Sequence, residues 1–523
     1  MRLDKLTLYH YKNLRDFTID FDQNSPNTVL VGRNGTGKSN LLEALTIIFR
    51  DLDLGETTPS FKYTLDYYIY RNKIKHKVEI DADPERTKDV ISIKVNGEAL
   101  SYSKFTENNK DQLTRYLPTM VFGYYSGLGE RMKERFYKHQ DKYYQALIHN
   151  IEKPLRTLFY SEPIHSKFVL LSFFTKDTGV ELNFLKKHLR IEALESVLFV
   201  MKEPPWKSKK GDPRFWNAGG TVQDFLDKLY NISLAPLRKT QPVQLDFRRT
   251  TKLEHLYLYL KDPDTLQQLA SIYEDQAEFF KALESTYLSD LIQDVRPLLR
   301  VRNVEGALTF REMSEGEQQL LMVLGLMRFT NQEESLFLLD EPDTYLNPSW
   351  SLQYLKFVRQ LVGSQKTSHL IMCTHDPLLI AGLKQSQVQI MLRDEETDQI
   401  RAETPKEDPR GMGVAAILTS NMFGLQAALD EETQRLLDER RRLADSTKLT
   451  KAQKERLAKL NEELAGLDFS ITMRDPLYKE FVLAMNKLQS PKIKETVYLT
   501  PEQQEDQRKL ALEILSELKS KRK

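Results

Sequence analysis

A glycine-rich stretch near the N-terminus constrains the fold of this chain more than any other feature. It consists of Gly32, Arg33, Asn34, Gly35, Thr36, Gly37, Lys38 and Ser39, and Asn40 follows it directly. The apolar run at residues 28–31 predicts a buried strand before it, and residues 40–45 predict the first turns of a helix after it. A strand, a glycine loop and a helix in this order form the context that a phosphate-binding loop requires.

The chemistry of a phosphate-binding loop explains why these residue types are needed. Glycines let backbone N–H groups converge on phosphate oxygens, and the N-terminus of the following helix adds partial positive charge. The ammonium group of Lys38 would reach the β- and γ-phosphates, and the hydroxyl of Ser39 would bind Mg²⁺. The stretch therefore predicts a site for ATP and Mg²⁺ that includes every residue from Gly32 to Asn40.

A second apolar strand, predicted at residues 336–340, ends in the carboxylates Asp340 and Glu341. In a nucleotide-hydrolysing site Asp340 would hold Mg²⁺, directly or through water, and Glu341 would polarise the attacking water. A core strand that merely ends in a polar turn has the same pattern. This segment alone leaves both interpretations open.

Two further segments flank that strand in the sequence. Ser314, Glu315, Gly316 and Glu317 precede an apolar helix predicted at residues 320–327. Residues 370–373 predict another core strand, and His375 lies just beyond its end. A histidine at this point would sense the γ-phosphate, or it would be a hydrogen-bonded structural residue. Its place in the series of motifs favours the sensor.

The order of these motifs resembles the ABC-type ATPase heads of the RecF, SMC and OLD families. A hairpin predicted at residues 6–21, and residues 342–347, which resemble the D-loop of those heads, strengthen the likeness. The resemblance covers roughly residues 1–126 and 296–405. It implies an α/β fold and a head-to-head dimer or higher oligomer. In such a dimer Ser314 and the backbone at Gly316 and Glu317 of one copy cap the γ-phosphate held by the other.

Two departures from the family pattern leave catalysis open. Transporter-like signatures read Ser-Gly-Gly, whereas Glu315 follows Ser314 here, and a carboxylate pointing inward would repel phosphate. Related heads also supply a Gln after the strand that we predict at residues 119–126, and none stands there. We expect an ATPase, and its rate of hydrolysis does not follow from the sequence.

The overall composition narrows the remaining classes. Lys and Arg number 76 against 75 Asp and Glu, so the net charge of +1 gives no general sign of nucleic-acid binding. The longest apolar run, residues 320–327, is too short to cross a bilayer. A single cysteine, Cys373, excludes internal disulfides and thiolate metal clusters. These features predict a cytoplasmic protein with no membrane partner.

We divide the chain into four parts. Residues 1–126 form the first part of an ABC-type P-loop ATPase head, and residues 296–425 form the second part. Residues 127–295 between them predict a mostly helical insertion. Residues 426–523 predict a helical, partner-binding C-terminal region, in which one helix runs from an N-cap at Thr450 to Gly466.

Two basic clusters in the insertion allow a nucleic-acid partner. In residues 206–216, basic side chains alternate with Trp206, Phe215 and Trp216, and would grip a phosphate backbone and stack on bases. A surface loop anchored by two tryptophans explains the same pattern, and we favour it. Arg248, Arg249 and Lys252 form a second cluster with the same ambiguity.

The segment after His375 distinguishes branches of the family. OLD enzymes carry a Toprim nuclease there, but the acidic residues 394–398 fit a hairpin turn better than a metal site. The chain then continues through residues 411–425 into helices. This ending resembles the ATPase subunits of Septu antiphage systems, PtuA-like proteins also found beside retrons, which work with a separate HNH nuclease. The resemblance implies a sensor or regulatory ATPase of a defence complex. The alternative is a RecF-like DNA-binding ATPase of repair or recombination.

Overall fold

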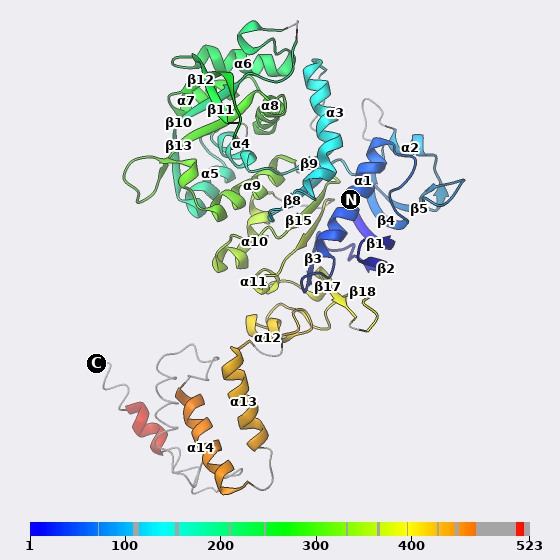
Figure 1. The fold of residues 1–523 in the computed structure, drawn as a ribbon, viewed down its shortest axis with the longest axis vertical. Coiled ribbons are helices and arrows are strands. Elements are labelled where there is room, and N and C mark those ends of the chain that lie inside the picture. Colours follow the sequence, from blue (N-terminus) through cyan, green and yellow to red (C-terminus); the bar gives the residue numbers. More distant parts are fainter. Residues whose placement is uncertain are drawn as a thin grey trace. The chain divides into compact units, whose positions relative to one another are not determined.

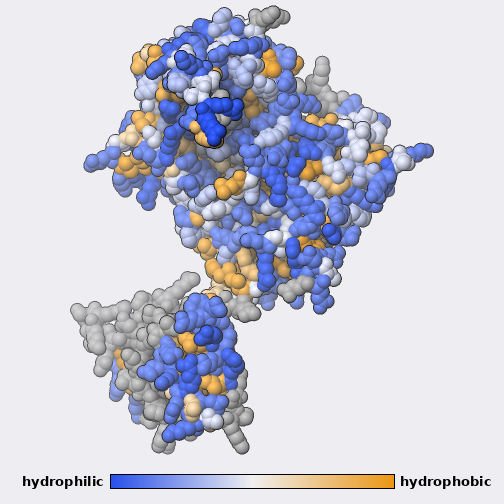
Figure 2. Space-filling view, in the orientation of Figure 1, coloured by the Kyte–Doolittle hydropathy of each residue, from blue (hydrophilic) through white to orange (hydrophobic). Residues whose placement is uncertain are grey.

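The computed structural model divides the chain into two compact units, Met1–Leu425 and Gln426–Lys523 (Figure 1). It describes all residues except 72, 108–114, 152–155, 209–210, 245–246, 331–332, 363–366, 395, 426–427, 445–448, 467–508 and 517–523. The fold is α/β, as predicted. Hydrophilic residues cover most of the face shown in Figure 2. No helix in the described part of the chain is long and apolar enough to span a membrane.

A seven-stranded sheet with the order β18-β17-β3-β16-β15-β8-β9 forms the centre of the first unit. Its strands are β3 (Asn27–Gly32), β8 (Val121–Tyr125), β9 (Leu158–Tyr160), β15 (Leu336–Asp340), β16 (His369–Cys373), β17 (Val388–Arg393) and β18 (Ile400–Glu403). All pairs are parallel except β17 with β18. Because helices cover both faces of such a sheet, its strands are apolar throughout, which is how the sequence revealed β3, β15 and β16.

The register of the parallel strands brings distant motifs to one edge. Asp340 at the end of β15 lies opposite Cys373 in β16, and Cys373 lies opposite Leu30 in β3. The glycine loop, the carboxylates after β15 and the segment after β16 all leave the sheet at its carboxyl edge. That edge is where ligands bind in open α/β sheets.

A second, antiparallel sheet has the order β2-β1-β4-β5-β6-β7. Its strands are β1 (Arg2–Tyr11), β2 (Leu14–Asp20), β4 (Tyr63–Arg71), β5 (Ile74–Ala82), β6 (Ile91–Val95) and β7 (Glu98–Ala99). The hairpin predicted at residues 6–21 is confirmed by the antiparallel pairing of β1 with β2. In the turn between β6 and β7, Asn96 and Gly97 both adopt the positive φ of a type I′ turn. One apolar core joins this sheet, helix α1 (Lys38–Leu54) and the central sheet.

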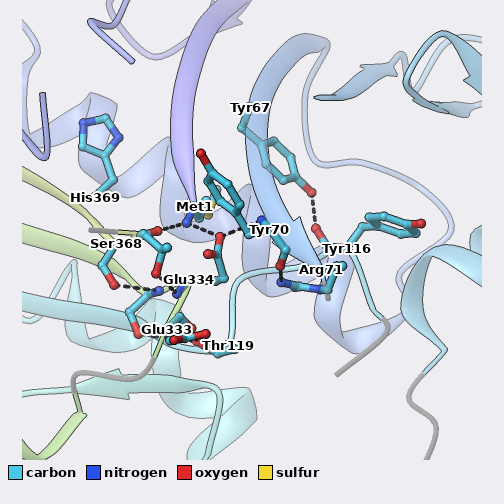
Figure 3. A network of polar contacts seen from close by, with 12 residues as sticks. Met1, Tyr67, Tyr70, Arg71, Tyr116, Thr119, Glu333, Glu334, Ser368 and His369 are labelled. Carbon is cyan, nitrogen blue, oxygen red and sulfur yellow. Dashed lines mark hydrogen bonds and ion pairs between the residues drawn. The ribbon is translucent and has the colours of Figure 1, made fainter. Parts of the chain in front are cut away.

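A polar network fastens the two sheets together beside the start of β15 (Figure 3). The carboxylate of Glu334 is buried, contacts the amino group of Met1, the residue before β1, and accepts a hydrogen bond from the backbone N–H of Tyr70 at 3.1 Å. Tyr67 of β4 donates its hydroxyl to the carbonyl of Tyr116 at 2.8 Å. These contacts position β15, which carries Asp340 at its far end.

The insertion, residues 127–295, contains the expected helices. They are α3 (Tyr137–Ile148), α4 (Ile164–Phe173), α5 (Val180–Phe184), α6 (Gly220–Ile232), α7 (Pro263–Ala270) and α8 (Gln276–Leu288). The remaining helices of the first unit are α2 (Tyr102–Thr106), α9 (Glu315–Thr330), α10 (Pro348–Leu361), α11 (Pro377–Ile380) and α12 (Val414–Thr419). Figure 1 shows α6, α7 and α8 gathered at one end of this unit, with β17 and β18 at the other.

A five-stranded antiparallel sheet that the sequence did not predict begins in the insertion and ends beyond residue 295. Its order is β11-β12-β10-β13-β14, with β10 (Ile191–Lys202), β11 (Leu237–Gln244), β12 (Thr250–Leu260), β13 (Ile292–Val301) and β14 (Leu308–Thr309). The register of β10 against β13 shifts at three places. Such irregularities break the alternation of apolar and polar residues by which a strand is recognised. β13 also crosses the expected boundary at residues 295 and 296.

The insertion shares its core with the head. One apolar cluster includes residues of β3 and β8, of α9, and of α4, α6 and α8. Within it, Glu284 of α8 is fully buried and binds Arg156 at 2.6 Å and His165 of α4 at 2.7 Å. Burial alone would raise the pKa of Glu284, but its partners His165 and Arg156 lower it to about 2. This ion pair joins the insertion helices beside the central sheet.

The second unit contains a helical hairpin. Helices α13 (Glu431–Ala444) and α14 (Lys451–Gly466) contact each other, and Arg456 pairs with Glu439 across them at 2.7 Å. Thr450 begins α14 as predicted, with its N–H donating to the side chain of Gln453 at 2.9 Å. Residues 509–516 form a further described helix.

We predict that Glu284→Ala destabilises the first unit strongly, because it leaves Arg156 buried without its carboxylate. Removing one partner of a buried ion pair costs about 3–5 kcal/mol of unfolding free energy. The control Glu278→Ala removes a half-exposed carboxylate of the same helix that pairs with Lys281, and should cost about 1 kcal/mol or less. Urea unfolding followed by tryptophan fluorescence measures both, and equal losses would contradict the prediction.

Candidate nucleotide-binding site

The glycine loop between β3 and α1 has the backbone shape that phosphate binding needs. Gly37 adopts φ 88°, and a Cβ atom there would lie 2.7 Å from the side chain of Leu14. Only glycine fits this position. Thr36 closes the loop by donating its hydroxyl to the carbonyl of Arg33 at 2.8 Å. The residues from Gly32 to Ser39 thus form a tight turn that leads into the first turn of α1.

Lys38 is buried with its charge only partly compensated. Its ammonium group donates to the carbonyl oxygens of Gly32 at 2.9 Å and Arg33 at 3.3 Å. Burial lowers the pKa of Lys38, while nearby groups that include Asp340 and Glu341 raise it. Since both hydrogen-bond acceptors are neutral, the ammonium keeps a strong attraction for an anion such as a phosphate.

Asp340 offers an unused ligand beside Ser39. Its side chain is only 4% exposed, and burial raises its pKa to about 6, although a hydrogen bond with Ser39 opposes the shift. Its Oδ1 atom is buried without a hydrogen-bond partner. An orphaned carboxylate oxygen next to a hydroxyl fits Mg²⁺, which is usually held by one or two carboxylates together with substrate phosphates. Ser39 and Asp340 are therefore the residues that would hold this ion.

Glu341 and His375 lie together at the same edge. The His375 Nε2 atom is 3.5 Å from the Glu341 carboxylate, and both side chains are more than a third exposed. Glu341 has a φ of 52°, which is strained for a non-glycine residue, and its N–H donates to the carbonyl of Cys373 at 3.0 Å. Partial burial and the Lys38 charge lower the pKa of His375, so it is neutral at pH 7.

Other residues that support the loop had no recognisable signal in the sequence. Asn13, in the turn between β1 and β2, donates to the carbonyl of Gly35 at 2.9 Å and accepts from Asn40 at 2.6 Å. Arg393 at the end of β17 donates to the same carbonyl at 3.0 Å. The Arg393 contact depends on the pairing of β17 with β3, which no local pattern reveals.

The signature segment is built on the start of α9. The backbone N–H and hydroxyl of Ser314 donate to the carboxylate of Glu317 at 2.9 and 2.8 Å, which forms a helix cap. A Cβ atom on Gly316 would lie 2.4 Å from the carbonyl oxygen of Tyr345, so glycine lets the D-loop approach. Gln319 accepts from the N–H of Tyr345 at 3.2 Å and donates to the hydroxyl of Tyr124 at 2.7 Å.

Ser314, Gly316 and Glu317 do not meet the glycine loop of the same chain. They line a groove of about 670 Å³ together with Tyr345 and other residues, and no residue of the glycine loop lines it. Among the described residues, no hydrogen bond or ion pair joins this segment to Gly32–Ser39. The signature segment and the glycine loop of one chain therefore lie apart.

The remaining candidates have structural roles in the described residues. Trp206 donates its indole N–H to the carbonyl of Ser289 at 2.7 Å, and Trp216 donates to Glu254 at 2.9 Å. This supports the anchored surface loop, although residues 209–210 lie outside the described part. Asp394 accepts the N–H of Thr397 at 2.9 Å in a turn between β17 and β18. No metal-binding group of three His, Cys, Asp or Glu occurs among the described residues.

Two family models match the chain. One is described as an AAA domain, putative AbiEii toxin, type IV toxin–antitoxin system, and covers residues 161–381. The other is an AAA ATPase domain and covers residues 1–186. Together they span the glycine loop, the signature segment, the carboxylates after β15 and His375.

Curated relatives include the Septu protein PtuA of Bacillus mycoides (strain KBAB4), 27% identical over 221 residues, which are 40% of this chain and 30% of that protein. The DNA replication and repair protein RecF of Synechococcus sp. (strain JA-3-3Ab) is 32% identical over 108 residues, which are 19% of this chain and 27% of RecF. The chain thus spans less than a third of the length of these two relatives.

Solved structures that match include an SMC head bound to the C-terminal winged-helix domain of ScpA, with a TM-score of 0.33 and 12% identity. That match covers 78% of this chain and 98% of the other. The SMC head domain of Thermotoga maritima has a TM-score of 0.32 and 13% identity, over 77% of this chain and 99% of the other.

We predict that Lys38→Ala lowers ATP affinity at least about 100-fold, because hydrogen bonds from a charged donor to phosphate contribute about 1.5–3 kcal/mol each. Isothermal titration calorimetry with ATP and Mg²⁺ measures the loss. Lys5→Ala, which removes a half-exposed lysine of β1, is the matched control and should bind normally. Near-normal affinity in Lys38→Ala with an unchanged melting temperature would refute the site.

Proposed function

We propose that this chain, an ABC-type ATPase of the RecF and SMC class that resembles PtuA, hydrolyses ATP in sites shared between two copies and regulates a separate nuclease in an antiphage defence complex. The observation that carries the ATPase assignment is the buried, unpartnered oxygen of Asp340 beside Ser39 and Lys38. A deeply buried carboxylate oxygen without a hydrogen-bond partner is costly unless a ligand uses it.

Each residue at the carboxyl edge then has a defined task. Lys38 leaves its carbonyl partners and binds the β- and γ-phosphates. Ser39 and Asp340 would hold Mg²⁺, which would supply positive charge to offset that of the phosphates. Glu341 orients the attacking water and accepts its proton. Because His375 is neutral, its ring N–H can donate a hydrogen bond to the γ-phosphate while the side chain stays near Glu341.

A second copy completes the site. Ser314 and the following backbone N–H groups stand at the N-terminus of α9, which carries partial positive charge, yet they line a groove apart from the glycine loop. Their distance from their own loop supports a head-to-head dimer in which each copy supplies the signature segment to the nucleotide of the other. Oligomers larger than a dimer are compatible with the same pairing.

We predict that Glu341→Gln stops hydrolysis while ATP binding persists, because the amide cannot take the proton from water. The variant should therefore accumulate as an ATP-bound dimer, seen by analytical ultracentrifugation. Glu403→Gln, an exposed substitution on β18, should hydrolyse ATP normally. A Glu341→Gln protein that still turns over, or that stays monomeric with ATP bound, would contradict this mechanism.

The regulatory role is supported by two observations. The chain resembles the Septu protein PtuA over 221 residues. Its acidic segment after β17 is a hairpin turn in the described residues, and Asp394 is engaged by the backbone of that turn. We propose that an HNH-type nuclease is a separate polypeptide and that it binds the helical region of residues 426–523. The nucleotide state of the head would set its activity.

A RecF-like role in DNA repair or recombination is the second candidate. The match with RecF, 32% identical over 108 residues, favours it. In that case the dimer binds DNA without a nuclease partner. The two candidates differ in a measurable way, because only the defence complex requires the C-terminal region to contact a second protein.

We predict that the purified chain with ATP and Mg²⁺ or Mn²⁺ cuts neither DNA nor RNA, and that cleavage requires a nuclease that is a second polypeptide. Deletion of residues 426–523, which form a separate compact unit, should abolish co-purification of that nuclease and spare ATP binding. If this chain alone cleaves nucleic acid and the Asp394→Ala variant does not, the chain would instead resemble the OLD nucleases in function. Tight ATP-dependent DNA binding without any nuclease partner would favour the RecF-like role.

A further inference from the structure

A short basic segment of the insertion is held rigidly against the head. The π-helical turn η2 (Leu185–Leu189) inserts Leu185 and Leu189 into the core, where both are at most 2% exposed. The ring of His188 packs against Phe357 of α10, with ring centroids 4.7 Å apart. Single π-helical turns are rare and occur often at functional sites. The backbone of this turn is therefore anchored to the core.

This basic segment lines the groove that holds the signature residues. Lys187, His188 and Arg190 line it together with Ser314, Glu315, Gly316 and Glu317, and with Tyr345, Asn347 and Trp350 of the D-loop and α10. The groove, of about 670 Å³, is large enough to admit a triphosphate. The groove that holds the signature residues therefore contains cationic side chains that belong to the insertion.

Two of these side chains carry charge without a counterion. Neither Lys187 nor Arg190 forms an ion pair or side-chain hydrogen bond among the described residues, although Glu315 and Glu317 line the same groove. The carboxylate of Glu317 is already used by Ser314. Partial burial and nearby lysines lower the pKa of His188, so its ring is neutral. Two unpaired cations beside a signature serine favour an anionic ligand.

We propose that Lys187 and Arg190 contact the triphosphate of ATP bound to the glycine loop of a second copy, alongside Ser314. This inference rests on the proposed shared site. The guanidinium of Arg190 can bind two phosphate oxygens at once, and Lys187 acts as a point charge. Their positive charges also offset the carboxylate of Glu315, the departure that distinguishes this signature from Ser-Gly-Gly.

Mixed dimers test the proposal. One copy, the signature half, supplies Ser314 and carries Lys38→Ala. The other copy, the loop half, supplies Lys38 and carries Ser314→Arg. Only a dimer of these two copies contains one complete site. Arg190→Gln or Lys187→Gln on the signature half should reduce kcat/KM for ATP about 10- to 100-fold, as expected for lost charge-assisted hydrogen bonds. Arg190→Gln on the loop half should leave the rate intact, because the groove of that half faces no working loop.

Lys186→Gln is the matched control, because Lys186 is exposed on the same turn but does not line the groove. It should have no effect on either half. The reference mixture contains the two halves without any substitution in residues 186–190. If this mixture fails to hydrolyse ATP, the shared site is refuted, and this inference with it. If that mixture is active, an effect of Arg190→Gln on the loop half, or on neither half, overturns the inference alone. Weaker binding of a fluorescent oligonucleotide to Arg190→Gln with normal ATP hydrolysis also overturns it, and assigns the groove to nucleic acid.

Discussion

The parallel register of β3, β16 and β15 is the constraint on which the site depends. It places Asp340 opposite Cys373, and Cys373 opposite Leu30, so that motifs far apart in the sequence leave the sheet at one edge. The Glu334 network fixes the opposite end of β15 to the antiparallel sheet (Figure 3). A slip of one residue in this pairing would move Asp340 to the other face of the sheet. The polar network and the apolar core therefore hold the few side chains of the candidate site in position.

Several of those side chains are held in states that cost folding free energy. Lys38 is buried on neutral carbonyls, Asp340 has an orphaned oxygen, and Glu341 has a positive φ. Each departure would be removed by a simple substitution, such as an apolar residue at Asp340. Such strain persists where the surroundings over-determine it, and it clusters at functional sites. The buried Glu284 differs from these residues, because both of its oxygens have partners.

Local signals made part of the structure predictable. The apolar strands β3, β15 and β16, the hairpin at residues 6–21 and the cap at Thr450 each depend on a few adjacent residues, and each lies where the sequence predicted it. The sheet of the insertion was not foreseen, because register shifts in β10 interrupt its periodicity. Contacts between distant segments were equally hidden. Arg393 reaches the glycine loop only because β17 pairs with β3, and Arg190 shares a groove with Ser314 only because of tertiary packing.

A short series of contacts joins the carboxylates after β15 to the signature segment of the same chain. Ser126 donates its N–H to the carbonyl of Asp340 at 3.2 Å, and its hydroxyl lies 2.9 Å from that of Thr344 in the D-loop. The next residue, Tyr345, is bound by Gln319 of the signature helix. Because packed contacts of this kind do not deform freely, a displacement of Asp340 is passed to α9 and to the groove it lines. In the dimer that we propose, that groove would serve the other nucleotide. These contacts would then connect an event at one nucleotide to the phosphate contacts of the other.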